Sequence, residues 1–446
     1  SASHSEKNTT IMKRLTQILL LLFVSLTAHG QKDGVHSFLE KGQVNFEDSA
    51  KLYATLLANT PIEPEFTYAP HFAIVGFGGN FYFSTGARLR FTGSYDWGNP
   101  VRNPSAMGVE GIEKVDTKRG LFQMGAGTSK LYFNIIGFPN TGNQVGLFVS
   151  LNLDASQNNT YSIKAGQVYM RYRHIQCGYA TSLYNDRAAD SYAINDASPC
   201  ASGSHSAVQI NYQHALTKHI TCGIGVEMPR AEFTRCDTKD IEEDYKQDNT
   251  YQRIPDIPLY LDYSWGSDNH VRLSGIIRNI SYYDITRREA RNVFGWGLKL
   301  TGKYCLGPLT LYGMVQGGKA IANYVAGNSE SDLDLVPAAD PARFGELEAT
   351  KSFGVIGAIQ YDITHRVFVT ALYSMMRNYT PDYHLTEASI PWNSQLRRGM
   401  YASANIVWRI SDLFSTGLEY CYGSKRLEGG AYLHNNRLFG MFMMNF

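Results

Sequence analysis

The chain has 446 residues, of which 13% are aromatic, including 29 Tyr and 22 Phe, and its 41 Gly are spread along its whole length. The net charge of +1 says little about partners as a total, and the mean hydropathy of -0.26 argues against a helical membrane protein. That mean does not exclude a membrane β-barrel, because lipid-facing and water-facing residues alternate there and average out. No linker or shift of composition divides the chain, so the composition predicts one all-β protein.

The beginning of the chain has the order of a secretory signal. An apolar run over residues 15–27 follows a basic pair and precedes small residues. The run is too short to span a bilayer as a helix. We therefore expect Met12 to be the true start, residues 1–30 to be upstream sequence and signal peptide, and the mature protein to begin at Gln31.

From residue 81 onward, polar and apolar residues alternate with a period of two in segments of about ten residues, the pattern of transmembrane β-strands. Val367, Val369 and Tyr373 share one face of their segment, while Thr370 and Ser374 share the other. The sequence predicts sixteen such segments, near residues 81–95, 119–134, 143–154, 161–172, 174–181, 204–214, 218–228, 256–265, 268–283, 291–304, 307–317, 352–363, 364–377, 399–410, 412–424 and 434–446.

The connections between these segments alternate between short turns and long polar loops. This alternation is typical of outer-membrane barrels, in which the short turns are periplasmic and the long loops extracellular. Loop 182–203 is the candidate to fold inward and narrow a pore, and the alternative is that it covers the outer rim. The expected long loops are residues 96–118, 182–203, 229–255, 318–351 and 378–398.

The last predicted strand ends on Phe446, an aromatic carboxy terminus of the kind by which the barrel-assembly machinery recognises its clients. A closed barrel also requires the last strand to pair with the first, because an open edge cannot be satisfied in lipid. Residues 31–80 lack the strand pattern, and a short helix is compatible with Val35 to Leu57. We expect residues 31–80 to be a periplasmic segment or partial plug, and residues 81–446 to be the barrel.

Projecting each strand by the parity of its residues predicts a basic lumen. Rings of Arg and Lys favour anions in a pore, and the planar fork of Arg fits a carboxylate. The alternative is that these side chains hydrate the lumen, pair with its acids or lie at the rims. The predicted lumenal acids are Glu227, Asp262, Asp362 and Glu419. The predicted lumenal cations are Arg88, Arg90, Lys130, Arg171, Arg173, Arg272, Arg278, Lys299, Lys303, Arg366 and Arg409.

Of the six cysteines, Cys200 and Cys236 lie in long polar loops, and a disulfide between them is a hypothesis. The other four fall in or at the ends of predicted strands, where they are interpreted as isolated small hydrophobes. No pair has metal-ligand spacing, so no metal or cofactor is expected. Four tryptophans fall near strand ends or on outward positions and are interpreted as an interfacial girdle, namely Trp97, Trp265, Trp296 and Trp408.

Two functional hypotheses from different classes follow. The first is a porin for the passive diffusion of small anionic solutes. The second is a barrel that conducts nothing and serves a structural or secretion-machinery role, with a lumen packed shut by side chains or by residues 31–80. An enzyme is not expected, because the chain has no Gly-x-Ser-x-Gly elbow, no His-Glu-x-x-His and no phosphate-cradling Gly loop.

Several sequence blocks resemble the DcaP-type family, trimeric outer-membrane porins associated with dicarboxylate uptake. The similarity runs over about residues 75–446, and the blocks that carry it are Phe81 to Trp97 with its Arg-x-Arg, Ala165 to Tyr169, Pro229, Pro255-Asp256 and Trp296 to Leu298. The strand chemistry and the Gln31 cleavage site also suit a Bacteroidetes-like outer membrane.

The resemblance implies a sixteen-stranded barrel, a homotrimer and a positively charged eyelet that prefers dianions. Carried over by position, Arg88, Arg90, Arg171 and Arg173 match the basic wall. The family often has a coiled-coil extension at its N-terminus, and this sequence does not show one. The partners expected are outer-membrane lipid and small anionic solutes, and not nucleic acid.

Overall fold

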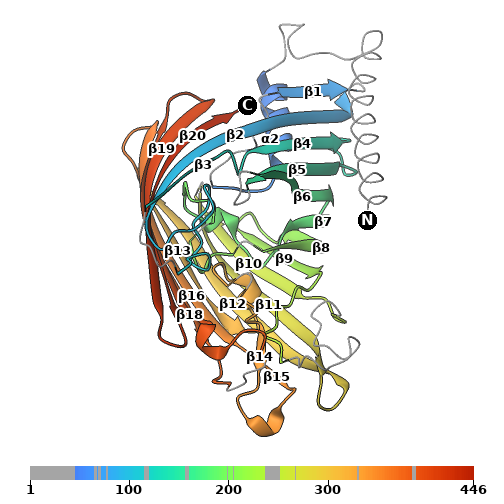
Figure 1. Ribbon diagram of the computed structural model, residues 1–446. Helices are drawn as coiled ribbons and strands as arrows, with labels where there is room; N and C mark the ends of the chain where they lie inside the picture. The colour runs from blue at the N-terminus through green and yellow to red at the C-terminus, as the bar shows by residue number, and fades with distance from the viewer. Residues whose placement is uncertain are drawn as a thin grey trace, which may run out of the picture.

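The computed structural model describes residues 46–64, 68, 72–76, 79–114, 120–155, 160–197, 199–203, 205–236, 252–266, 268–328, 331–383 and 388–446. The expected signal peptide and the Gln31 cleavage site lie outside these residues. Within them, one antiparallel sheet curls into a closed barrel (Figure 1). No helix in the described part of the chain is both long enough and apolar enough to cross a membrane.

The barrel has sixteen strand positions, as the alternation predicts. Strands β3 and β4 pair in line with the same neighbour, β2, and together fill one position. Strand β20 pairs with β2 from Arg88↔Asn445 to Gly98↔Asn435, which closes the barrel. The strands are β2 (Phe81–Gly98), β3 (Leu121–Gly125), β4 (Lys130–Gly137), β5 (Val145–Ala155), β6 (Tyr161–Tyr172), β7 (Ile175–Thr181), β8 (Ser206–Ala215), β9 (Ile220–Glu227), β10 (Ile257–Trp265), β11 (Asn269–Asp284), β12 (Glu289–Leu306), β13 (Leu309–Lys319), β16 (Lys351–Asp362), β17 (Val367–Tyr379), β18 (Leu396–Arg409), β19 (Phe414–Leu427) and β20 (Tyr432–Asn445).

The predicted single strand at 119–134 is therefore interrupted, at residues 126–129. Thr128 there has a φ of 68°, which breaks the extended backbone. The Thr128 carbonyl accepts a hydrogen bond from Nη2 of Arg88 at 2.8 Å, so the interruption turns a backbone acceptor toward the lumen. The phase of the alternation shifts by one residue across the break, because the outward side chains are even-numbered in β3, such as Phe122 and Met124, and odd-numbered in β4, such as Leu131.

All the long connections lie at one end of the barrel, as predicted, and short connections at residues 285–288 and 428–431 lie at that end as well. Seven short connections, beginning with residues 138–144, form the turn end, where the carboxy terminus also lies (Figure 1). The loop end carries the long connections, namely residues 99–120, 182–205, 228–256, 320–350 and 380–395. The loops contain the small hairpin β14 (Leu335–Pro337) and β15 (Leu347–Ala349) and the 3-10 turns η2 (Arg187–Ala189), η4 (Ala322–Tyr324), η5 (Pro341–Arg343) and η6 (Trp392–Ser394).

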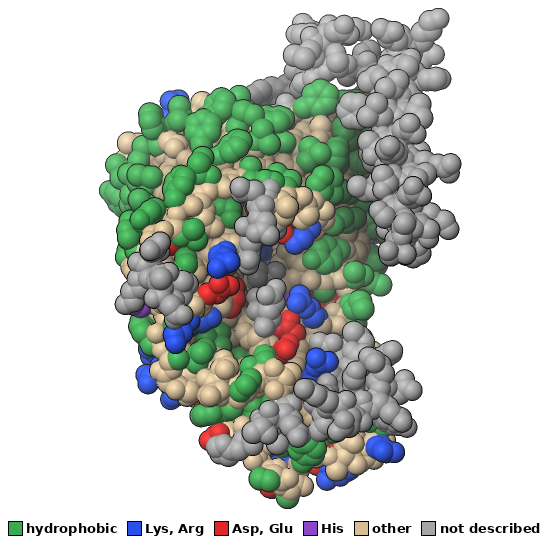
Figure 2. Space-filling model, in the orientation of Figure 1, with side chains coloured by type: hydrophobic (Ala, Val, Ile, Leu, Met, Phe, Trp, Pro, Cys, Tyr) green, Lys and Arg blue, Asp and Glu red, His purple; other side chains and the backbone are tan. Residues whose placement is uncertain are grey.

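The outer wall is apolar and carries aromatic side chains near both ends. Tyr263 and Trp265 stack near the turn end, with ring centroids 5.7 Å apart, and Tyr95 and Trp97 pack edge to face near the loop end at 4.9 Å. Figure 2 shows hydrophobic side chains covering the upper part of the visible face, while charged side chains gather mainly in the lower half. This arrangement is that of a transmembrane β-barrel with an apolar belt and two aromatic girdles.

Residues before the barrel form a helix, in the region where the sequence is compatible with one, and a strand that the sequence pattern does not predict. Helix α2 (Phe46–Ala58) packs Leu52 and Leu56 against Ile136 of β4. Strand β1 (Phe72–Gly76) pairs with the first residues of β2, from Gly76↔Phe81 to Phe72↔Thr85. Beyond β1, Phe446 donates from its backbone nitrogen to Ala87 at 2.9 Å. Strand β1 therefore covers the part of the β2 edge that β20 is too short to reach.

Candidate functional site in the lumen

Three loops fold into the barrel instead of standing over its rim. Met107, Ile194 and Tyr324, one from each loop, are fully buried in one apolar cluster with side chains of the lumen wall. Glycine in the wall makes room for them. A Cβ on Gly354 of β16 would lie only 2.6 Å from Cβ of Ala201 in loop 182–203. Loop 182–203 thus crosses the lumen. The sequence makes it the candidate to fold inward, because it follows the fifth predicted strand.

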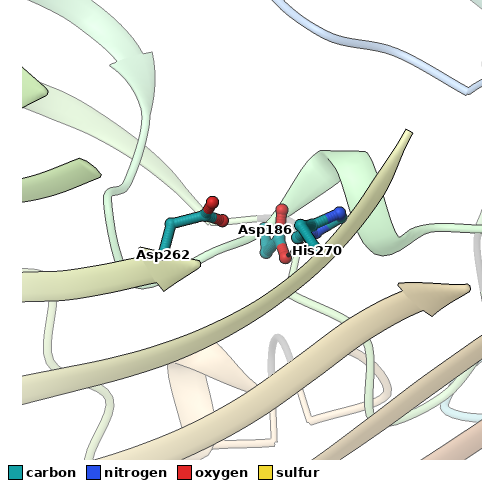
Figure 3. A group of neighbouring side chains, drawn as sticks. All are labelled: Asp186, Asp262 and His270. Atoms are coloured by element: carbon teal, nitrogen blue, oxygen red, sulfur yellow. Dashed lines mark hydrogen bonds and ion pairs between the residues drawn. The ribbon is translucent and has the colours of Figure 1, made fainter. Parts of the chain in front are cut away.

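One end of this loop is fastened to the wall through Asp186 (Figure 3). Oδ2 of Asp186 lies 2.9 Å from Nε2 of His270 and accepts a hydrogen bond from Thr301 at 2.5 Å. Nη1 of Arg272 lies 3.8 Å from Oδ1 of Asp186, and its Nε lies 3.2 Å from Oδ2 of Asp262. Burial alone raises the pKa of Asp186, but His270, Arg272 and Thr301 outweigh it and lower that pKa below its ordinary value.

Asp186, Asp262 and His270 have the composition of a metal site, with ligand atoms within 4.8 Å of one another. Their surroundings do not fit a cation. The guanidinium of Arg272 already supplies positive charge to both carboxylates. We therefore interpret Asp186, together with its partners His270 and Arg272 of β11 and Thr301 of β12, as a latch that holds loop 182–203 against these two strands.

The far side of the loop is fastened by backbone contacts. Glu419 accepts hydrogen bonds from the backbone nitrogens of Ile194 and Asn195, and Arg90 donates to the carbonyl of Ile194. Cys200 lies near the wall, with Sγ 3.3 Å from Oγ of Ser374. The hypothesis of a Cys200–Cys236 disulfide is wrong for this structure: neither thiol takes part in one, because Cys200 is directed at β17 and not at the neighbouring loop.

The segment before the barrel enters the turn end of the lumen. The carbonyls of Ala58 and Asn59 accept hydrogen bonds from Arg171 at 2.6 Å and from the Tyr169 hydroxyl at 2.8 Å. Oε2 of Glu63 lies 2.5 Å from Nζ of Lys130. Burial raises the pKa of Glu63, but the charges of Lys130 and Arg88 outweigh that effect and lower it.

A cavity of about 620 Å³ remains between this segment, the start of loop 182–203 and the wall from β6 to β11. Three arginines line it, Arg171, Arg187 and Arg272, together with the single carboxylate of Asp186. Arg187 pairs with Asp190 at 2.7 Å. Arg171 forms no ion pair with any described carboxylate, and its Nη2 donates to Gln176 at 2.7 Å. Arg171 is therefore the one lining arginine that no described carboxylate neutralises, since Arg272 contacts Asp186 and Asp262.

The other predicted wall cations serve mainly as structural anchors. Arg278 is fully buried between Asp256 at 3.0 Å and Asp334 at 3.1 Å. Nζ of Lys299 donates to Asn185 at 2.9 Å and lies 4.2 Å from the ring centre of Tyr184. Arg88 and Arg90 point inward as predicted, but they are buried and bond to backbone carbonyls.

Three predicted lumenal cations lie at the turn-end rim. Arg173 belongs to the turn between β6 and β7, has a φ of 53°, and donates to the carbonyl of Gly142 at 2.7 Å. Arg366 is exposed in the turn at 363–366. Arg409 is exposed at the last position of β18, 4.8 Å from the ring centre of Phe368. Projecting parity beyond the last paired residue placed Arg173 and Arg366 wrongly, because a turn no longer alternates.

The acids were underestimated from the sequence. Glu227, Asp262 and Glu419 are buried as predicted, whereas Asp362 is exposed. Parity also places Arg437 inward beside Phe439, and it is fully buried, with Nη2 2.6 Å from Oδ2 of Asp96. The other acids that neutralise wall cations mostly lie outside the regular strands, namely Glu63, Asp186, Asp256 and Asp334.

Neither a protein-family model nor a curated protein sequence matches the chain. Solved structures do. The outer membrane channel DcaP of Acinetobacter baumannii superposes with a TM-score of 0.66 at 15% identity, over 82% of this chain and 97% of that chain. An anion-selective porin from Comamonas acidovorans has a TM-score of 0.53 at 10% identity, over 82% of this chain and 100% of that chain. At these identities the likeness concerns the fold. The resemblance to DcaP-type porins is thus confirmed at that level, and this chain has the fold of an outer-membrane porin.

Proposed function

We propose that the protein is an outer-membrane channel for small anions, with its long loops outside and its turn end in the periplasm. The observation that carries this proposal is the cavity of about 620 Å³ with Arg171, Arg187 and Arg272 on its walls. Its volume lies within the range of small-molecule sites, roughly 300–1,000 Å³. A partly desolvated anion there interacts with several fixed cations at once, whereas a cation meets the same field as a barrier.

The described conformation is a closed one. Beyond Asp186 and Arg187, the cavity narrows to a space of about 30 Å³ beside Lys299 and Thr301. Solute passage therefore requires loop 182–203 to move away from the wall. The latch at Asp186 stands on this route, which makes it the point where movement of the loop would open the channel.

A non-conducting barrel is the second candidate, and the packed lumen favours it. Side chains from three loops, and Leu52, Leu56 and Tyr68 from the segment before the barrel, pack into the interior, as expected of a barrel with a structural or assembly role. The two candidates differ in one measurable respect: a closed channel opens part of the time, and a structural barrel does not.

Uptake into proteoliposomes separates the two candidates. Purified protein is reconstituted, and the entry of succinate is compared with that of erythritol, a neutral solute of similar size. The channel proposal expects both to enter faster than into protein-free vesicles, with succinate ahead. Entry of neither solute would support the non-conducting barrel, and entry of erythritol alone would contradict the anion preference.

Two finer properties are also proposed on the basis of the DcaP-type resemblance. One is a homotrimer, which the mass of the protein in detergent by light scattering would test. The other is a preference for dicarboxylates, supported by the presence of more than one arginine on the walls of a single cavity. Faster uptake of succinate than of butyrate would support it, and equal uptake would contradict it.

A further inference from the structure

The outer wall near the loop end has a row of four side chains that folding alone does not explain. Lys319 of β13 and Lys351 of β16 stand directly opposite each other, flanked in register by Trp296 of β12 and Tyr379 of β17. Like charges directly opposite on neighbouring strands are destabilising. Both lysines are exposed, and neither forms an ion pair with a carboxylate in the described part of the chain.

The row lies at the level of the loop-side aromatic girdle. Trp296 and Tyr379 are 40% and 49% exposed on the outer wall, in the position that interfacial aromatics take beside lipid headgroups. Placing two cations on a lipid-facing wall is costly away from the interface. At headgroup level the cost is small, and negative groups are present to meet them.

An apolar groove of about 700 Å³ begins at the two lysines and runs down the wall toward the turn end. Its floor is Gly317, which lies in register between Leu298 and Phe353. A Cβ on Gly317 would meet only ordinary contacts, at 3.6 Å or more. The absence of a side chain at Gly317 therefore leaves a furrow between the large side chains of Leu298 and Phe353. Leu300 and Val315 continue the apolar lining one row further.

Toward the loop end, a second groove of about 820 Å³ shares Lys319, Lys351 and Tyr379 and adds further positive charge. Arg397 pairs with Glu428 only at 3.8 Å. Arg377 lies 4.6 Å from the ring centre of Tyr379, and its buried Nε has no hydrogen-bond partner. Glu348 and Glu428 also line this groove, so cations outnumber carboxylates, but do not exclude them, near the point where the two grooves meet.

We infer that this surface binds an acyl lipid with a phosphorylated headgroup in the outer leaflet, with the phosphate at Lys319 and Lys351 and one acyl chain over Gly317. The two lysines complement a phosphate, and the apolar groove beside them fits an acyl chain. A soluble anion would make no use of the groove, and a second copy of the chain would bring no phosphate to the lysines. The inference rests on the proposed outer-membrane placement but not on conduction. It assigns the outer wall a role separate from that of the lumen.

Native mass spectrometry of the delipidated full-length protein, titrated with bisphosphorylated lipid A, tests the site. Lys319→Ser with Lys351→Ser should weaken binding by about tenfold or more, since each interfacial cation contributes measurably to anionic-lipid binding. The control, Lys114→Ser with Lys218→Ser, removes the same charge from exposed positions elsewhere and should leave binding unchanged. Gly317→Leu should also weaken binding, because its side chain fills the acyl groove.

Each opposite outcome overturns the inference. Equal binding by the Lys319/Lys351 variant and the control would show that the lipid lies elsewhere. Equal binding of dephosphorylated lipid A would remove the role of the lysines, and inorganic phosphate binding as tightly as lipid A would reduce the site to one for a soluble anion. A change of oligomeric mass in the Lys319/Lys351 variant, without loss of lipid binding, would make this face a contact between copies. Solute uptake is measured in parallel, so failure of the lipid site and failure of the channel are distinguishable.

Discussion

Arg171 and Arg173 are separated by one residue, yet only Arg171 faces the cavity. Arg171 donates at 2.6 Å to the carbonyl of Ala58 inside the barrel, whereas Arg173 donates at 2.7 Å to the carbonyl of Gly142 in the neighbouring turn. From the sequence, both are predicted to be wall cations of the same kind. In the structure, Arg171 lies on the proposed solute route and Arg173 lies at the rim, so the two can serve as test and control.

This pair gives the first prediction. Arg171→Ser should lower the anion-to-cation permeability ratio of the channel, by about half or more, because it removes the one cavity arginine without an ion-paired carboxylate among the described residues. Arg173→Ser removes the same charge and should change the ratio little. The preference of the unmodified protein should fade toward about 1 M salt, where the Debye length is roughly 3 Å. Equal effects of the two substitutions on reversal potential would show that net charge, and not the cavity, sets selectivity.

The latch gives the second prediction. Asp186→Asn should increase the frequency of channel openings, because it weakens the contacts that hold loop 182–203 to His270, Thr301 and Arg272. Losing one partner of a buried ion pair costs about 3–5 kcal/mol. The control is Asp190→Asn on the same loop, which loses a partly exposed pair with Arg187 worth about 1 kcal/mol or less. If the two variants open equally often in single-channel recordings, the contacts of Asp186 do not control channel opening.

The third prediction concerns helix α2. Replacing Leu52 and Leu56 together by Ser should release the helix from Ile136 and raise the mean conductance, since both side chains are buried beside the turn-end mouth. Each loss of a buried leucine side chain costs about 2–5 kcal/mol locally, and the barrel strands stay paired. Tyr53→Ser, at an exposed position of the same helix, is the control. Unchanged conductance in the double variant would mean that residues 46–64 do not obstruct the pore.

The fourth prediction is a dependence of stability on pH. Burial, with the charges of Arg278, Arg230 and Lys299, lowers the pKa of His205 to about 3. Above about pH 6.5, His205 is neutral whether the protein is folded or unfolded. As the pH falls below that value, only the unfolded chain binds the proton, so stability decreases by about 2 kcal/mol by pH 5.

His205→Phe should abolish this part of the pH dependence. The measurement is the free energy of unfolding by urea in lipid vesicles at pH 7.5 and pH 5.0, for the unmodified protein and the variant. The loss of unfolding free energy between pH 7.5 and pH 5.0 should be smaller in the variant by about 2 kcal/mol. The same difference in both proteins would mean that His205 is already protonated when folded.

The strands could be predicted from the sequence because each of them repeats one constraint many times. In β17, lipid on one side and the lumen on the other impose alternation from Val367 onward, and an error of one residue would expose every polar side chain to lipid. The break between β3 and β4 and the added strand β1 escaped prediction, because they depend on which edges of β2 the neighbouring strands leave uncovered.

The character of the lumen could be predicted only in part. The inward direction of Arg88, Arg90 and Arg278 followed from parity. Their partners did not, because the carbonyls of Thr128 and Ile194 and the carboxylate of Asp334 reach them from segments outside the regular strands. The sequence thus predicts the charges of the wall and not the loops that pair with them. The remaining positive cavity could be found only from the folded chain.

The central claim is that a basic cavity makes this barrel an anion channel, and one measurement tests it most directly. Purified protein in a planar bilayer between unequal KCl concentrations gives a reversal potential whose sign identifies the favoured ion. The account predicts discrete openings and a reversal potential displaced toward the equilibrium potential of chloride. Displacement toward that of potassium, or an absence of openings in the unmodified protein and in Asp186→Asn alike, would contradict it.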